Sequence, residues 1–116
     1  MRKFLILLAL TLAPTSLSAG GPLKVAVTAY TASPGETDAR PDLSACGRTF
    51  SGQLAVSRDL LRKFPCGSRV RLTINGHTQT YVVNDTMNAR WTMKVDVLKR
   101  SRAEAFRFGR KTGYIQ

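Results

Sequence analysis

The chain has 116 residues, enough for one domain and too few for two domains of ordinary size. Its 18 basic and 7 acidic residues give a net charge of +11, which favours polyanionic partners such as anionic wall glycans, acidic lipids or nucleic acid. Two cysteines without metal-ligand spacing and a single histidine argue against a metal site, and no cofactor is expected.

The N-terminus has the three parts of a secretory signal peptide. Arg2 and Lys3 precede an uncharged apolar run at residues 4–13, and small residues suited to signal peptidase follow at 14–19. The alternative is a membrane anchor, but a helix that spans a bilayer needs about 20 apolar residues and this run is shorter. We therefore predict a cleaved signal peptide and no transmembrane anchor.

The predicted domain boundaries follow from this signal. Residues 1–19 form the signal peptide, residues 20–116 form the mature domain, and cleavage falls after one of three positions, Ser18, Ala19 or Gly20. The mature chain keeps 16 basic and 7 acidic residues, a net charge of +9. We expect a monomer exported to the periplasm or secreted.

The two cysteines fit an exported protein. Cys46 and Cys66 are expected to form a disulfide in an oxidising compartment, and closing a loop of this length stabilises a small domain by roughly 3 kcal/mol. The alternative is a pair of unbonded thiols.

The first half of the mature chain contains two strand patterns and one short helix. Residues 23–30 are rich in β-branched residues and predict a strand, whereas residues 31–52 carry prolines and glycines and predict a long irregular loop. Residues 53–56 predict a second strand. Ser57 is placed to cap a helical turn over residues 58–64.

The second half begins with a hairpin. Residues 69–74 alternate between polar and apolar side chains, and residues 78–84 form another strand pattern. Asn75 and Gly76 lie between them, and both residue types tolerate the positive φ that a tight hairpin turn requires. Residues 85–93 predict a loop.

The C-terminal part adds two strands and a helix. Residues 94–98 and 112–116 are strand patterns, and between them Ser101 and Glu104 form a capping-box pattern for a helix that Gly109 ends. Six strands with two short helices predict a mainly β fold. A closed barrel is expected, because closure removes the exposed edges of a sheet.

Aspartate is the best candidate for acid–base chemistry. Asp96 lies between Val95 and Val97, so its side chain lies on the opposite face of that strand from the two valines. If that face points into the barrel mouth, partial burial raises the pKa of the carboxyl group, and Asp96 could act as a general acid. The alternative is a solvent-facing aspartate on an edge strand. Asp85 ends a predicted strand, and no serine–histidine or cysteine–histidine set is evident. Enzymes that cleave glycosidic bonds use carboxylic acids for the proton transfers, and hydrolysis usually needs two of them. Because this chain has few acidic residues, an intramolecular transglycosylation, which can work with one carboxyl group, is favoured.

Several short segments resemble the 3D domain family, which is named for three aspartates. The segments lie in the family's order over most of the mature chain, at residues 27–32, 54–57, 65–70, 82–86, 95–97 and 108–109. This family adopts a double-psi β-barrel, as does the catalytic domain of membrane-bound lytic transglycosylase A, and rare lipoprotein A is more distantly related. The resemblance implies a six-stranded barrel of that kind.

The resemblance also assigns roles to individual residues. Asp96 takes the place of the catalytic acid/base and Asp85 that of its partner aspartate. The first aspartate of the family is replaced here by Ser57, with Asp59 two residues on, so that this role is altered or lost.

The loop after Asp85 also departs from the family, because bulkier residues replace its glycines. Trp91 could stack on a sugar ring and Arg90 could bind a peptide carboxylate. The alternatives are a core tryptophan and a solvated arginine. The full set of substrate-binding candidates is Thr31, Ser57, Asp59, Thr86, Asn88, Arg90 and Trp91.

The main functional hypothesis is cleavage of peptidoglycan glycan strands by lytic transglycosylation. Asp96 would protonate the glycosidic oxygen and then accept the proton of the attacking C6 hydroxyl, while Asp85 holds the geometry. The second hypothesis is a non-catalytic, expansin-like barrel module that binds peptidoglycan or another anionic wall polysaccharide. A third hypothesis, a secreted binder of nucleic acid, has only the charge in its favour, and no specific nucleic-acid partner is expected.

Overall fold

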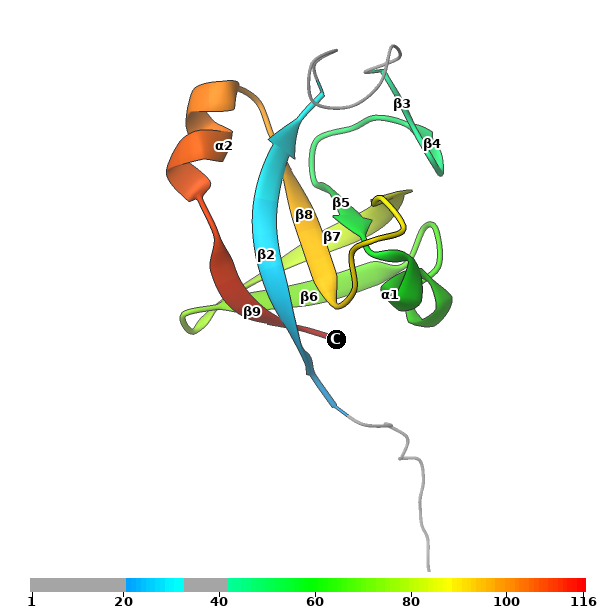
Figure 1. Cartoon of the computed structure of the whole chain (residues 1–116), viewed down its shortest axis with the longest axis vertical. Helices are drawn as coiled ribbons and strands as arrows, with labels where there is room; N and C mark the ends of the chain where they lie inside the picture. The colour runs from blue at the N-terminus through cyan, green and yellow to red at the C-terminus, as the bar shows by residue number, and fades with distance from the viewer. Residues whose placement is uncertain (1–20, 33–41) are drawn as a thin grey trace, which may run out of the picture.

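A computed structural model describes residues 21–32 and 42–116 of the chain (Figure 1). The predicted signal peptide and the loop acids Glu36 and Asp38 lie outside the described residues. Among the residues described, no helix is long and apolar enough to cross a bilayer.

The described chain folds into a closed barrel of six strands, as predicted. Around the barrel the strands follow the order β2, β8, β5, β7, β6 and β9, and β9 closes the ring against β2. Their bounds are Leu23–Thr31 for β2, Gln53–Val56 for β5, Arg69–Ile74 for β6, His77–Thr86 for β7, Lys94–Lys99 for β8 and Lys111–Ile115 for β9. Two pairs, β2 with β8 and β5 with β7, are parallel, and the others are antiparallel.

Two helices and one small hairpin complete the fold. Helix α1 (Arg58–Lys63) follows β5, and helix α2 (Arg102–Phe108) follows β8 (Figure 1). The hairpin pairs β3 (Leu43–Ser44) with β4 (Gly47–Arg48). Sequence patterns gave only an irregular loop there, because two-residue strands have no detectable period.

The core fills the barrel with branched aliphatic side chains from all six strands, and Leu60 of α1 joins them. Strands β2, β6 and β8 alternate between buried and more exposed residues, so their inner and outer faces are distinct. The core residues are Val25, Val27, Leu54, Val56, Leu60, Val70, Leu72, Val83, Val95, Val97 and Ile115.

The predicted hairpin and the second helix are confirmed in their details. Asn75 and Gly76 have φ values of 50° and 81°, which suits the tight turn between β6 and β7. The Ser101 hydroxyl accepts a hydrogen bond from the Glu104 N–H at 3.2 Å, and α2 ends at Gly109 with φ 68°. Local sequence chemistry therefore fixes these two features.

Ser57 behaves differently from the prediction. It occupies the N-cap position of α1, but its side chain makes no capping hydrogen bond. Its hydroxyl accepts a hydrogen bond from the Lys94 N–H at 3.1 Å, and its own N–H donates to the Lys94 carbonyl at 2.9 Å. The tertiary contact between β5 and β8 takes precedence over the local cap.

Gly113 lies where the last strand closes the barrel. A Cβ atom there would lie 3.0 Å from the Thr73 carbonyl oxygen and 3.1 Å from side-chain atoms of Ile74 and Val27. The close approach of β9 to its neighbours therefore leaves room for hydrogen but not for a side chain.

Candidate functional site

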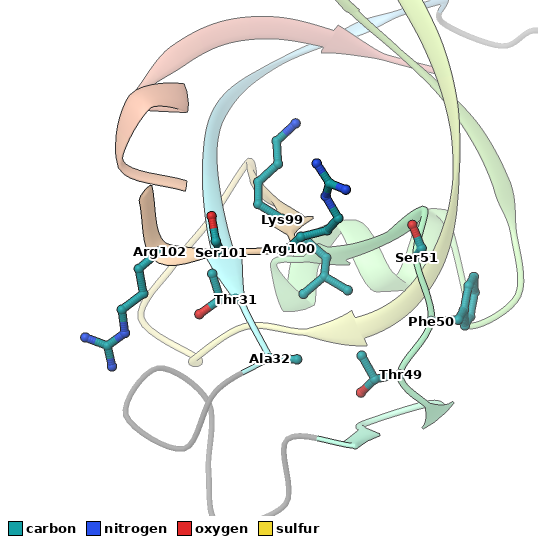
Figure 2. A pocket seen from close by; sticks show the side chains of 10 residues that line it. Thr31, Ala32, Thr49, Phe50, Ser51, Lys99, Arg100, Ser101 and Arg102 are labelled. Carbon is teal, nitrogen blue, oxygen red and sulfur yellow. The ribbon is translucent and has the colours of Figure 1, made fainter. Parts of the chain in front are cut away.

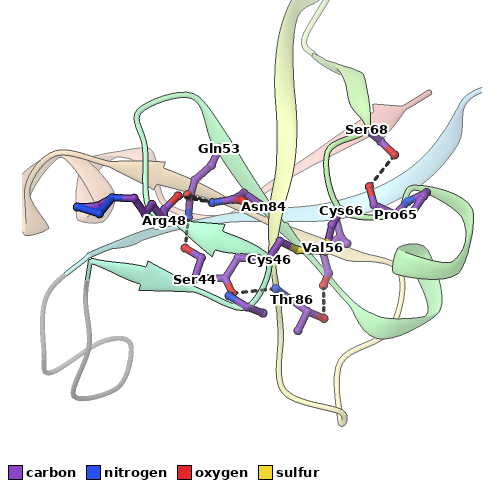
Figure 3. The surroundings of a disulfide bond; sticks show 12 residues. Ser44, Cys46, Arg48, Gln53, Val56, Pro65, Cys66, Ser68, Asn84 and Thr86 are labelled. Carbon is purple, nitrogen blue, oxygen red and sulfur yellow. Dashed lines mark hydrogen bonds between the residues drawn. A yellow bond between two sulfur atoms is a disulfide. The ribbon is translucent and has the colours of Figure 1, made fainter.

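A disulfide ties the segment that carries β3 and β4 to the barrel. Cys46 and Cys66 are bonded, with their Cα atoms 5.7 Å apart, which confirms the predicted disulfide. Beside it, the Cys46 N–H donates to the Asn84 carbonyl of β7 at 3.1 Å. Figure 3 shows the disulfide with the hydrogen-bonded side chains around it.

Gln53 is the centre of a buried polar network beneath this segment. The side chain is 0% exposed, and its Nε2 donates to the Tyr30 hydroxyl at 2.7 Å and to Ser44 Oγ at 2.9 Å. Its Oε1 accepts from Asn84 Nδ2 at 2.8 Å and from the Phe50 N–H at 3.1 Å. We call the group Tyr30, Ser44, Gln53, Asn84 and Asp85 the Gln53 network.

Asp85 is the outermost member of the Gln53 network. Its Oδ1 accepts hydrogen bonds from the backbone N–H groups of Ala45 and Thr86, both at 2.9 Å. Its Oδ2 accepts from the Tyr30 hydroxyl at 3.3 Å. Both carboxylate oxygens therefore bind the scaffold, and Asp85 holds the β3–β4 segment against β7.

Tyr30 is close enough to both candidate aspartates for their negative charges to affect its pKa. Burial is the largest influence and raises the pKa of Tyr30 far above its ordinary value; the negative charges of Asp85 and Asp96 raise it further, against the hydrogen bond from Gln53. The phenol consequently stays protonated and remains a hydrogen-bond donor toward Asp85 at neutral pH.

Asp96 lies on the outer face of the barrel wall. Its neighbours on β8, Val95 and Val97, are 0% and 1% exposed and belong to the core, so the Asp96 side chain points the other way. It is half-buried, and its Oδ1 accepts a hydrogen bond from the Thr28 hydroxyl of β2 at 2.9 Å. The carboxylate therefore faces the outside of the barrel, at its wall.

The two aspartates flank one residue of β5. Ala55 pairs with Asp85 on one side and with Asp96 on the other. Paired residues share a face of the sheet, so both carboxylates lie on the outer wall, with Cα atoms roughly two strand spacings or 10 Å apart. This spacing places two acids on one surface, as a glycan-cleaving site would need, but one of them is bound to the scaffold.

The two residues at the place of the family's first aspartate have structural contacts. Ser57 is 0% exposed, so it reaches no ligand without rearrangement. Asp59 accepts the Met93 N–H at 2.9 Å, which joins α1 to the loop before β8. Partial burial raises the pKa of Asp59, but hydrogen bonding to Ser57 and to Met93 lowers it more, and the net pKa lies below the usual range.

Three other substrate-binding candidates take separate positions. Thr86 is half-buried, and its hydroxyl donates to the Val56 carbonyl at 3.1 Å. Thr31 is 3% exposed at the end of β2. Asn88 is exposed, and its Oδ1 accepts the Arg90 N–H at 3.0 Å within the loop. The structure therefore does not gather these side chains into one cluster.

Trp91 packs over the outer face near the start of β8. The Lys94 Nζ lies 3.7 Å from the centre of its ring, and the Arg90 guanidinium carbon lies 4.9 Å from it. Trp91 is half-buried and Lys94 is buried. Lys94 is two residues before Asp96 on the same face of β8, so the indole lies beside the Asp96 surface.

A cavity lies near the other end of β8, at the barrel end. Its volume is about 390 Å³, and Figure 2 shows its lining side chains coming from the end of β2, the segment before β5 and the stretch from the end of β8 to the start of α2. Leu98, two residues after Asp96, is one of them. We call this space the basic cavity; it is lined by Thr31, Ala32, Thr49, Phe50, Ser51, Leu98, Lys99, Arg100, Ser101 and Arg102.

Sequence reasoning missed the residues that organise this surface. Gln53 has no motif that marks it, and Thr28 lies in the 27–32 segment without being singled out, because the partners of both residues come from distant parts of the chain. The resemblance of residues 27–32 to the 3D family, a segment that includes both Thr28 and Tyr30, was the available signal. Within residues 21–32 and 42–116, no group of three histidine, cysteine or acidic side chains is placed to hold a metal ion.

Comparison with known proteins gives a match in structure alone. No protein-family model matches the chain, and no curated protein matches it in sequence. The crystal structure of an apo expansin from Clavibacter michiganensis matches with a TM-score of 0.58 and 20% sequence identity over 82% of this chain. The chain spans about half of that structure, 49% of its length. The likeness shows a shared fold, which fits the predicted double-psi β-barrel.

Proposed function

We propose that this chain is an expansin-like barrel module that binds cell-wall polysaccharide. Its polymer is peptidoglycan, and the module binds the glycan strands without cleaving them. The fold shared with an expansin supports this proposal. The disulfide is consistent with an extracytoplasmic place of work, because such bonds persist in oxidising compartments.

The hydrogen bonding of Asp85 is the observation that carries the proposal. A partner aspartate in catalysis needs a free oxygen to orient a substrate hydroxyl or a water. Here the two Asp85 oxygens accept two backbone N–H groups and one phenol, all from the barrel and its tethered segment. Asp96 and Trp91 remain on the outer wall as a polar and aromatic surface for a glycan strand.

The test is a pull-down of the mature protein with purified peptidoglycan sacculi, followed by mass spectrometry of the soluble fraction. We expect retention on the sacculi and no released glycan fragments. Trp91→Ala should weaken retention. Tyr114, an exposed aromatic residue of β9, supplies the matched control Tyr114→Ala. The absence of any binding would reject the proposal.

Lytic transglycosylation is the second candidate. Asp96 faces the outer wall and not the barrel mouth, but its partial burial and its place on the same wall as Asp85 support this candidate. Asp96 is half-buried and hydrogen-bonded to Thr28 on the same wall as Asp85. In this reaction Asp96 donates its proton to the leaving glycosidic oxygen, the C1–O bond breaks, and the C6 hydroxyl oxygen bonds to C1 while its proton returns to the carboxylate. Anhydro-muropeptides released by the wild type and abolished by Asp96→Asn would establish this activity.

A further inference from the structure

The basic cavity has two chemically different sides. Lys99, Arg100 and Arg102 line it from the end of β8 to the start of α2, and none of the described residues that line it is acidic. Phe50 lines it from the segment before β5 and is 41% exposed. Cations on one side and an exposed ring on the other suit a ligand that has both a negative group and an apolar face.

Lys99 is held at the cavity by its surroundings. Its Nζ lies 5.0 Å from the centre of the Phe108 ring of α2, and the Lys111 Nζ lies 4.8 Å from the centre of the same ring. Figure 2 places Lys99 and Arg100 between Thr31 and Ser51, whereas the guanidinium of Arg102 points away from the others. Lys99 and Arg100 are therefore the two cations best placed to meet a ligand.

The ion pair of Arg100 does not prevent this role. Arg100 donates a hydrogen bond to Glu104 at 2.9 Å, but the Arg100 side chain is 86% exposed. An exposed ion pair between residues four apart in sequence contributes little free energy in water. A ligand carboxylate can share or displace this partner at little cost. The cavity, at about 390 Å³, lies in the usual range of small-ligand sites, roughly 300–1,000 Å³.

The basic cavity continues the outer surface that carries Asp96. Leu98 lines the cavity and lies on the same face of β8 as Asp96, two residues further along, or roughly 7 Å. A glycan strand that crosses the wall from Trp91 past Asp96 therefore arrives at Lys99 and Arg100.

We propose that the basic cavity is a subsite that recognises a carboxylate carried by the wall polysaccharide. Lys99 and Arg100 bind the carboxylate, and Phe50 packs against the apolar face of the residue that bears it. The subsite rests on the proposed function, because it selects among wall polymers that the barrel binds. Two sources supply this chemistry: carboxylates on peptide side chains and carboxylates on the sugar rings.

The experiment measures binding to native sacculi and to sacculi whose carboxyl groups have been blocked as amides. The double variant Lys99→Gln/Arg100→Gln is compared with Arg110→Gln/Lys111→Gln, which removes the same charge beside the same Phe108 ring but outside the cavity lining. We expect the wild type and the control to bind native sacculi about ten-fold more tightly than blocked sacculi. The cavity variant should bind both forms with the affinity of the wild type for blocked sacculi.

The outcomes separate this proposal from the proposed function. Wild-type protein that binds neither polymer would reject the function itself. Equal binding of native and blocked sacculi, or an equal loss in both double variants, would overturn the subsite and leave the function standing. A second arm with polygalacturonate identifies the source: cavity-dependent binding there assigns the site to ring carboxylates, and binding to sacculi alone assigns it to peptide carboxylates. Thermal unfolding of each variant verifies that it is folded.

Discussion

The Gln53 network and the basic cavity use polar side chains in opposite ways. In the Gln53 network, buried groups bind one another and the backbone, and the result is a tethered segment. In the basic cavity, the half-buried Lys99 and the exposed Arg100 and Arg102 line an open space beside Phe50. Buried and mutually satisfied polar groups stabilise the fold, whereas exposed ones that face a cavity are available to a ligand.

This contrast reassigns two features of the chain. Asp85 resembles a catalytic residue in sequence, yet its contacts are those of a scaffold residue. Lys99 and Arg100 resemble ordinary surface charges in sequence, yet they line a cavity near the Asp96 surface. Four predictions test whether side chains of the Gln53 network and its disulfide contribute to the free energy of unfolding while those of the basic cavity do not.

Removing the disulfide should have the largest effect. Cys46→Ser/Cys66→Ser frees the β3–β4 segment and should lower the free energy of unfolding by roughly 3 kcal/mol, because a 20-residue link no longer constrains the unfolded chain. Urea denaturation at pH 7 measures the change. An unaltered midpoint would mean that the Gln53 network alone holds the segment.

Gln53→Leu should come next. The substitution removes the four hydrogen bonds that Gln53 makes with Tyr30, Ser44, Asn84 and the Phe50 N–H, and we expect a loss of roughly 2–3 kcal/mol. The exposed residue Gln79 of β7 accepts a bond from Tyr81 and gives a matched control, since Gln79→Leu should cost much less. Similar losses in both variants would contradict the central role of Gln53.

Tyr30→Phe should cost about 1 kcal/mol at pH 7, because Asp85 and Gln53 each lose a partner. The cost should depend on pH. The pKa of Tyr30 is raised in the folded protein, so this phenol stabilises the fold below pH 10, and the contribution is lost as pH rises through the folded pKa. Denaturation between pH 7 and 11 should therefore show the difference from wild type shrinking above about pH 10. Tyr114→Phe should not reproduce this trend.

Arg100→Gln should have the smallest effect on stability, less than about 0.5 kcal/mol, because the Arg100–Glu104 pair is exposed. Equilibrium denaturation is again the measurement. A loss comparable with that of Gln53→Leu would make this cation a structural element and would end the contrast between the two regions.

The barrel was predictable because its strands carry local signals. Residues 69–74 alternate cleanly, and Asn75 with Gly76 specifies the turn that follows them. The second helix follows from Ser101 and Gly109, which lie at its two ends. Each of these features depends on residues that are close together in the sequence, so the sequence alone is enough to predict it.

The site was less predictable because its contacts join distant segments. Ser57 has the sequence context of a helix cap, but its hydroxyl accepts a hydrogen bond from the Lys94 N–H of β8, 37 residues away. Thr28 and Asp96 are 68 residues apart, and only the parallel pairing of β2 with β8 brings them together. The sequence placed Asp96 on the face of the strand opposite Val95 and Val97, but only the structure shows that the two valines lie in the core and that Asp96 therefore lies on the outer wall. Its catalytic role stays a prediction.

The ring order of the strands has a consequence for how the barrel assembles. Strand β2 is bonded to β8 and β9, the last two strands of the chain, as Figure 1 shows. Until residues 94–116 have left the ribosome or crossed a membrane, both edges of β2 lack their native partners. The barrel therefore cannot close before residues 94–116 are present, and the link from Cys46 to Cys66 is the one covalent constraint that can form before the ring is complete.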